Sequence, residues 1–206
     1  MGPFEKCVFV NCPFDAEFRQ MMLAMVFSIM RLGFFPRLAL ERNNSAESRI
    51  AKIVDLIKQS KYGLHDLSRM ESKEANELAR MNMPFELGLD YGCKHLKGGK
   101  WSDKRILVLD TAQYRYQAAL SDLAGSDIRS HNGDEQTAIR VIRDWLVTES
   151  LGTAASHRIL WSEFNDFNAY LADQLEDIGS KPEDIDDMPV PEVMKYMRDW
   201  FNQADE

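Results

Sequence analysis

The sequence lacks the features that mark membrane, secreted and disulfide-stabilised proteins. It has no run of 18 apolar residues, the length that a membrane-spanning helix needs. Its first residues show no basic stretch followed by an apolar signal core. The three cysteines, Cys7, Cys12 and Cys93, are odd in number and do not have metal-ligand spacing. We therefore expect reduced thiols, a cytoplasmic location and no metal site.

Two phosphate-binding motifs are absent as well. No GxGxxG follows the first apolar run and no GxxxxGK[ST] occurs, so the common dinucleotide and P-loop cradles are missing. The formal net charge of -8 provides no general attraction to nucleic acid. We expect no cofactor, no nucleic-acid partner and no membrane partner.

The composition is that of a globular chain. The 206 residues are 45% hydrophobic and 28% charged, enough for one ordinary domain with a small appendage. The charge is unevenly distributed: residues 151–206 carry 13 acidic and 4 basic residues, a net charge of -9, against 20 acidic and 21 basic residues before them. This asymmetry predicts a boundary near Leu151, between a body of residues 1–150 and an acidic tail of residues 151–206.

Short apolar runs alternate with helical patterns along the body. Strands are predicted at Cys7–Val10, Phe34–Glu41, Tyr62–Leu67, Arg105–Asp110 and Ser126–His131. Helices are predicted from an Asp15 cap to Leu32, after a Ser45 cap, from Pro84 to Leu96 and from Asp134 to Val147, with a polar loop at Arg69–Arg80. The alternation predicts an α/β fold with a small doubly wound, mainly parallel five-stranded sheet, flavodoxin-like in strand order.

The tail has a different pattern. Phe164, Phe167, Leu171 and Leu175 have helical spacing, and a second such group surrounds Met197 and Trp200. We expect a C-terminal extension of two or three helices that packs on the body or on a second copy of the chain, because so many aromatic side chains are costly to leave in water. A homo-oligomer is therefore expected.

Ligands of open parallel sheets bind at the carboxyl ends of the strands. Polar candidates for such a site follow the predicted strands or begin the next helix: Asn11, Asp15, Glu41, Arg42, Asp66, Ser68, Arg69, Asn82 and Glu86. The two arginines are suited to phosphate, because guanidinium groups pair with phosphate oxygens.

Glu86 is the main catalytic candidate. It lies in NMPFELGLDYG, where Pro84 at the first helical position would put Glu86 at the third. The structural alternative is a capping glutamate, since acidic residues stabilise the first helical turn. In favour of catalysis, the apolar residues Phe85, Leu87 and Leu89 would desolvate the carboxylate and raise its pKa.

Asp66 is the second candidate, and its alternative is a turn or capping role beside Ser68. A carboxylate pair can act at a glycosidic carbon, where one group stabilises positive charge and the other positions the sugar. His65 precedes Asp66 in the strand, so its side chain points to the opposite face and we interpret it as structural. Cys12 has no histidine at a diagnostic spacing and is not expected to be a nucleophile.

Three segments resemble the TIR-like and nucleoside 2-deoxyribosyltransferase-like group of folds: FVNCPFD, LHDLSR and NMPFELGLDYG, in this order. The resemblance covers roughly residues 6–146. It implies a flavodoxin-like sheet and cleavage or exchange of N-glycosidic bonds in nucleosides, nucleotides or NAD, in some members for antiphage defence. It maps Glu86 to the catalytic glutamate, Asp66 to the carboxylate at the sugar, and Asn11 and Phe14 to the loop that shapes the nucleoside pocket.

Three functions remain open at this point. The first is an N-glycosidase or ribosyl-transfer enzyme with a nucleoside or nucleotide ligand, in which Glu86 is the nucleophile or charge stabiliser. The second is a nucleotide-sensing module that uses the same cleft without turnover. The third is a protein-interaction domain in which the acidic tail is the functional surface.

Overall fold

The computed structural model describes residues 2–71 and 81–204 of the chain. Its centre is one sheet of five parallel strands in the order β2-β1-β3-β4-β5, which confirms the predicted flavodoxin-like α/β fold with a C-terminal helical extension. The strands are β1 (Cys7–Asn11), β2 (Phe35–Arg37), β3 (Tyr62–Asp66), β4 (Arg105–Asp110) and β5 (Arg129–Ser130). Every strand-to-strand connection crosses over, so helices cover both faces.

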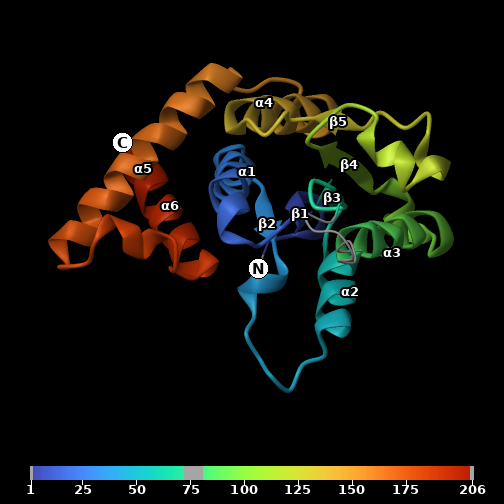
Figure 1. Cartoon of the computed structure of the whole chain (residues 1–206), viewed down its shortest axis with the longest axis horizontal. Coiled ribbons are helices and arrows are strands. Elements are labelled where there is room, and N and C mark those ends of the chain that lie inside the picture. Colours follow the sequence, from blue (N-terminus) through green and yellow to red (C-terminus); the bar gives the residue numbers. More distant parts are fainter. Residues whose placement is uncertain (1, 72–80, 205–206) are drawn as a thin grey trace.

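The two faces of the sheet carry different helices. Helices α1 (Arg19–Arg31) and α4 (Glu135–Leu146) cover one face, and α2 (Arg49–Gln59) and α3 (Asn82–Leu96) cover the other (Figure 1). Side chains alternate along each strand, so Val8 and Val10 join the core beneath α1 whereas Phe9 packs with α2.

Two predicted element starts are wrong by a few residues. Helix α2 begins at Arg49 rather than after Ser45, because Asn44 forms a turn in which its side chain accepts the Ala46 N–H at 3.0 Å. Asp15 does cap a helix, accepting the Phe18 N–H at 3.2 Å, but this is a 3₁₀ turn at Ala16–Phe18 that precedes α1.

The second strand is shorter than its apolar run. β2 ends at Arg37, and the chain continues into a 3₁₀ turn at Ala39–Glu41. β2 is an edge strand that contains Pro36, which has no N–H to add to the ladder. Leu38 is apolar because it is buried in the core, not because it is in a strand. The predicted polar loop at Arg69–Arg80 lies outside the described residues from position 72 onward.

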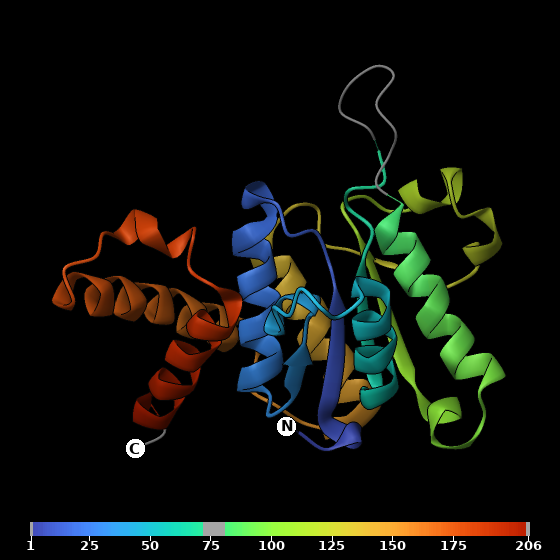
Figure 2. The same ribbon diagram turned by 90° about the horizontal axis from the view of Figure 1, so that it is seen from below.

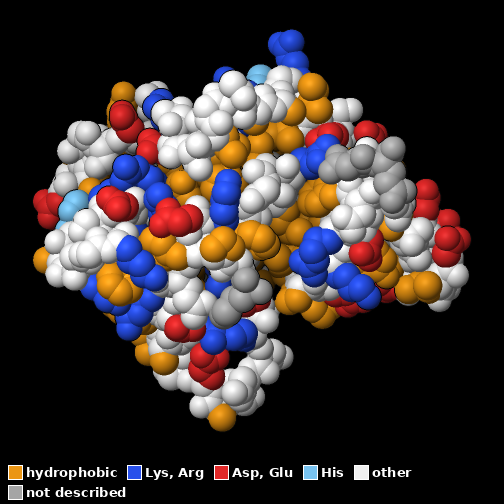
Figure 3. All heavy atoms as spheres, turned by 180° about the vertical axis from the view of Figure 1, so that it is seen from behind, with side chains coloured by type: hydrophobic (Ala, Val, Ile, Leu, Met, Phe, Trp, Pro, Cys, Tyr) orange, Lys and Arg blue, Asp and Glu red, His pale blue; other side chains and the backbone are white. Residues whose placement is uncertain are grey.

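The tail contributes to the core of the body. α5 (His157–Asp177) and α6 (Val190–Ala204) pack against α1, with the 3₁₀ turn Pro182–Ile185 between them (Figure 2). The Phe27 ring of α1 lies 5.4 Å from Phe164, 5.6 Å from Phe167, 5.8 Å from Trp200 and 5.1 Å from Phe201, measured between ring centroids. From the opposite side, apolar side chains extend across the middle of the molecule (Figure 3).

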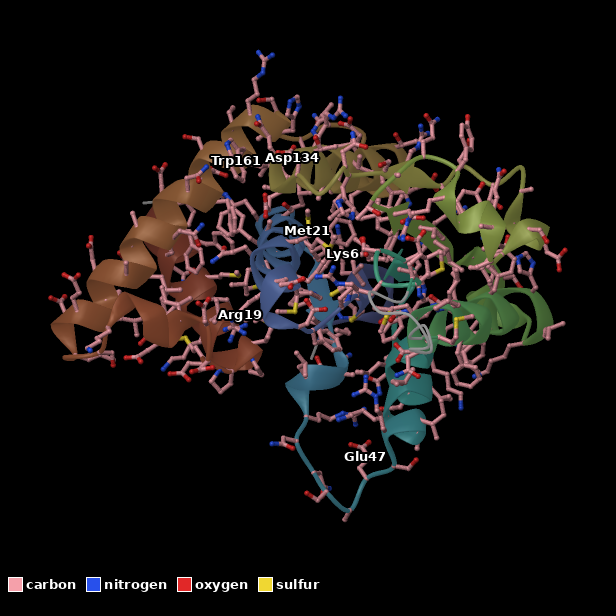
Figure 4. All side chains as sticks on the ribbon, viewed as in Figure 1. Lys6, Arg19, Met21, Glu47, Asp134 and Trp161 are labelled. Carbon is pink, nitrogen blue, oxygen red and sulfur yellow. The ribbon has the colours of Figure 1, made fainter. Side chains whose placement is uncertain are left out.

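The half-buried Arg19 connects α1 to the segment between the two tail helices by hydrogen bonds. Arg19 donates from Nη2 to the carbonyl oxygens of Ile185 at 2.6 Å and Met188 at 2.5 Å, and it lies between α1 and the tail in Figure 4. Arg31, at the other end of α1, donates to both carboxylate oxygens of Glu163 on α5. Within the described ranges, no helix combines the length and the apolar character needed to span a bilayer.

Candidate functional site

Glu86 lies deeper in α3 than its sequence context predicts. The helix begins at Asn82, with the Phe85 N–H bonded to the Met81 carbonyl at 3.0 Å, so Glu86 is the fifth helical residue and not the third. It belongs to the inward face of α3, with Met83 and Asp90. A first-turn capping role therefore does not account for a carboxylate at this position.

The surroundings of Glu86 alter its acidity. The residue is 5% exposed, and burial raises the pKa of its carboxyl group from 4.5 to about 6. Arg49, at the start of α2, opposes this shift in part, with Nη2 at 4.0 Å from Glu86 Oε1. Such a group is largely ionised at pH 7 and still exchanges protons close to neutrality, which suits acid–base or electrostatic catalysis.

A buried polar network lies between α3 and the sheet. Asn11 Nδ2 donates to the Met83 carbonyl at 2.9 Å and lies 3.0 Å from His65 Nδ1. His65 Nε2 is 3.0 Å from Asp90 Oδ2. Because Nδ1 accepts from an amide, the His65 proton is on Nε2 and is donated to Asp90. The network joins β1, β3 and α3, and thus fixes the helix that carries Glu86.

Lys104 completes this network from the residue before β4. Its Nζ lies 3.0 Å from Asp90 Oδ1 and also donates to the carbonyls of Ile57 and Ser60. Burial alone raises the pKa of Asp90, but the His65 hydrogen bond and the charge of Lys104 outweigh it and hold the pKa below its usual range.

Gly63 of β3 makes room for this ion pair. A Cβ atom built at Gly63 would lie 2.1 Å from Asp90 Oδ2, closer than real Cβ contacts come, and 3.0 Å from His65 Nε2, which is tighter than most. A glycine at this strand position is therefore required by the close approach of the Asp90 carboxylate.

Asp66 points away from α3 and is fully buried. Its Oδ1 accepts the Ser68 N–H at 2.9 Å, and its Oδ2 lies 3.0 Å from His131 Nε2 in the loop after β5. His131 Nε2 is also 2.9 Å from Ser68 Oγ. The expected separation of His65 and Asp66 onto opposite faces is present, but Asp66 is engaged by protein groups and has no surface free for a sugar.

Cys12 lies at the end of β1 among the carboxylates. Burial raises the pKa of its thiol well above the usual value, and the charges of Asp66, Glu86 and Asp15 raise it further. The thiol therefore stays protonated, in agreement with its exclusion as a nucleophile.

Most of the other predicted ligand-binding residues pair with charged side chains of the same chain. Arg69 donates to Asp15 at 2.9 and 3.2 Å and to Glu17 at 2.9 Å. Arg42 pairs with Asp55 at 3.0 Å and with Glu47, whose carboxylate lies beside the turn before α2 in Figure 4. The remaining three are Glu41, held by Arg37; Asn82, exposed at the start of α3; and Phe14, half-buried against the core.

Sequence reasoning missed Arg49, Asp90, Lys104 and His131. Asp90 could have been predicted from the sequence, because a residue four positions after Glu86 lies on the same face of the helix. Lys104 and His131 carry no local signal, since they reach their carboxylate partners only through the pairing of distant strands.

Three cavities of the described structure lie elsewhere. One of about 680 Å³ lies between β4 and α4, a second of about 680 Å³ lies along α3, and a third of about 160 Å³ adjoins the second; neither Glu86 nor Asp66 lines them. The described residues contain no group of three or more His, Cys, Asp or Glu side chains arranged to hold a metal. Family models, curated proteins and solved structures gave no match to this chain.

Proposed function

We propose that this chain cleaves or transfers an N-glycosidic bond of a nucleoside, nucleotide or NAD, with Glu86 as the catalytic carboxylate. One observation carries the proposal: a buried glutamate with a pKa of about 6 stands at the carboxyl end of a parallel sheet without a helix-capping role. The resemblance of NMPFELGLDYG to the deoxyribosyltransferase-like group selects the same residue.

The chemistry follows from the charge that develops on the sugar. As the carbon–nitrogen bond breaks, the base leaves with the electron pair and the sugar carbon becomes cationic. An ionised Glu86 stabilises the cationic transition state more than it stabilises the uncharged substrate. The low exposure of Glu86 strengthens this interaction, because little water screens it. Water or an acceptor hydroxyl then forms the new bond to the carbon, and its proton passes to Glu86, which releases it to the departed base or to solvent.

Arg49 takes the role of phosphate ligand in this proposal. Arg42 and Arg69 are held by close ion pairs at 3.0 and 2.9 Å, whereas the Arg49 side chain is 57% exposed and its ion pair with Glu86 is longer, at 4.0 Å. An exposed guanidinium beside the catalytic carboxylate is placed to bind the phosphate of a nucleotide substrate. Asp66 supports the loop after β5 through His131 and does not contact the sugar.

The test uses Glu86→Gln, which keeps the shape and removes the charge. Wild type is assayed for release of nicotinamide or free base from NAD and a panel of nucleosides and nucleotides. We expect Glu86→Gln to lower kcat about 10²–10³-fold and to retain binding. The control is Glu192→Gln, an exposed glutamate of the tail, which should leave the rate unchanged. Full activity of Glu86→Gln would exclude the catalytic assignment.

A second function, nucleotide sensing without turnover, uses the same site, and the exposed Arg49 guanidinium supports it, since a phosphate ligand serves binding with or without catalysis. Equilibrium binding to the same panel distinguishes the two. A wild type that binds a nucleotide and converts none of the panel supports sensing. Arg49→Gln should then weaken binding of nucleotides and leave binding of nucleosides unaffected.

A further inference from the structure

The outer face of α3 is mainly apolar, with His95 as an exposed titratable side chain. Four large side chains on or just before this helix are exposed: Met81 by 51%, Phe85 by 57%, Tyr91 by 40% and Leu96 by 87%. The helix has three charged residues; Glu86 and Asp90 are buried, and Lys94 donates to the Lys104 carbonyl at 2.6 Å. A surface helix with so little exposed charge is unusual in a chain of which 28% is charged.

This face is also hollowed. A cavity of about 680 Å³ lies between α3 and the segment 119–123; its walls include Gly88, Gly92 and Leu120, and also the polar residues His95, Ser121 and Asp122. A Cβ atom at Gly88 would meet nothing within 4 Å, and one at Gly92 would meet only Leu96 Cδ1 at 3.9 Å. Alanine fits at both positions of the single chain, and glycine weakens a helix. The single chain therefore does not explain these two glycines, and a close external neighbour does.

We propose that the outer face of α3 is the contact between two copies of this chain. Gly88, Gly92 and Leu96 follow one another at four-residue spacing and form a single ridge on α3. If two α3 helices pair antiparallel with the two-fold axis at Gly92, Leu96 of one protomer lies over Gly88 of its partner, and the reverse contact is identical. Leu96, the most exposed side chain of the face, thus enters the depression at Gly88 of the other copy.

The size and the charge of the face agree with a second copy as its occupant. The four exposed side chains present roughly 450 Å² on each copy, taking about 200 Å² for a fully exposed side chain of this size. A specific interface needs about 800 Å² per partner, and the walls of the cavity are available for the remainder. Each copy has a net charge of -8; Glu86 and Asp90 of α3 are buried and Asp122 is the acidic residue on the cavity wall, so two copies meet here with less repulsion than over most of the surface.

The test is the mass of the full chain in solution, measured by sedimentation equilibrium over a range of concentrations. We expect wild type to have twice the chain mass of 23.7 kDa. Leu96→Lys and Gly88→Asp should each weaken association at least tenfold. The double variant Leu96→Lys/Gly88→Asp should recover it, because a lysine then meets an aspartate at both symmetric contacts. The control Ile178→Lys alters a residue that is 67% exposed on the tail and should have no effect.

Thermal melts of the single variants show whether each still folds, and Gly88→Ala provides a second variant that favours the helix while filling the depression. A monomeric wild type, dimers that persist in both single variants, or an equal loss in Ile178→Lys would overturn the proposal. A double variant that stays monomeric would overturn the stated pairing of Leu96 with Gly88. Because Glu86 faces inward, none of these outcomes depends on catalysis.

Discussion

The two faces of the sheet are buried in different ways. Beneath α1 and α4 the core is continuous and apolar, and it extends through Phe27 to the aromatic residues of the tail. Beneath α2 and α3 the apolar clusters are smaller, and Asp90, His65 and Lys104 are fully buried among them. Apolar burial stabilises in proportion to its area, whereas a buried ion pair adds little net stability. The first face therefore supplies stability, and the second positions the helix that carries Glu86.

The largest effect is expected from removal of the tail. Truncation after Leu151 would expose the α1 side chains that α5 and α6 cover, each costing roughly 1.5–3 kcal/mol. We expect aggregation or a much lower melting temperature, measured by differential scanning calorimetry and light scattering. Unchanged stability and solubility would show that the apolar face does not depend on the tail.

The next effect tests the polar face. Lys104→Met removes the cation beside buried Asp90 and should lower the free energy of unfolding by about 3–5 kcal/mol, measured by urea denaturation. The matched control is Lys61→Met, which breaks the surface pair with Glu5 and should cost less than about 1 kcal/mol. Equal losses in the two variants would refute the structural role of the buried network.

A smaller effect of opposite sign is expected at Glu86. Its pKa is about 6 in the folded chain against 4.5 as the ordinary value, so the folded state binds the proton more tightly. Wild type therefore loses stability as pH rises from about 4.5 through 6, the interval in which the buried group ionises. Glu86→Gln avoids this loss and should be about 1–2 kcal/mol more stable at pH 7, with no difference below pH 4.5.

Urea denaturation at pH 4.5, 6 and 8 measures this dependence. Glu192→Gln, at an exposed position, should show no pH-dependent difference from wild type. A Glu86→Gln variant that is less stable than wild type at pH 7 would restore the capping explanation.

The smallest effect compares two helix N-termini. Asp134 accepts the Thr137 N–H at 2.7 Å at the start of α4, whereas Ser48 makes no side-chain bond at the start of α2. Asp134→Ala should cost about 1 kcal/mol of unfolding free energy and Ser48→Ala almost none. The same urea measurements decide this, and equal costs would contradict the difference between the two caps.

Strands could be predicted from the sequence where all residues of an apolar run are both buried and in extended backbone. The continuous apolar run Arg105–Asp110 is a strand over the predicted range, and β3 differs from its prediction by one residue. The run Phe34–Glu41 was overextended, because Leu38 and Ala39 are buried without being in a strand. A run of apolar residues reports burial directly and backbone conformation only indirectly.

The site was predictable only in part, for a related reason. Local spacing predicts the helix α3 and the inward orientation of Glu86. Asp66 shows the limit of the rule that polar residues at the carboxyl ends of strands form the site. That rule brings Asp66 to the correct edge of the sheet, yet the partner that buries its carboxylate, His131, is 65 residues further along the chain. Whether a strand-end acid meets solvent or a distant loop depends on tertiary contacts that periodicity does not contain.

The packing of α1 has a consequence for how the chain is made. Phe27 is synthesised well before two of its ring partners, Trp200 and Phe201 of α6. At roughly 5–20 residues per second, about 10–30 s separate the synthesis of α1 from that of α6. Throughout that interval the face of α1 that α5 and α6 cover stays open. Incomplete translation products should therefore be chaperone clients and early targets of proteolysis, even when they contain every strand of the sheet.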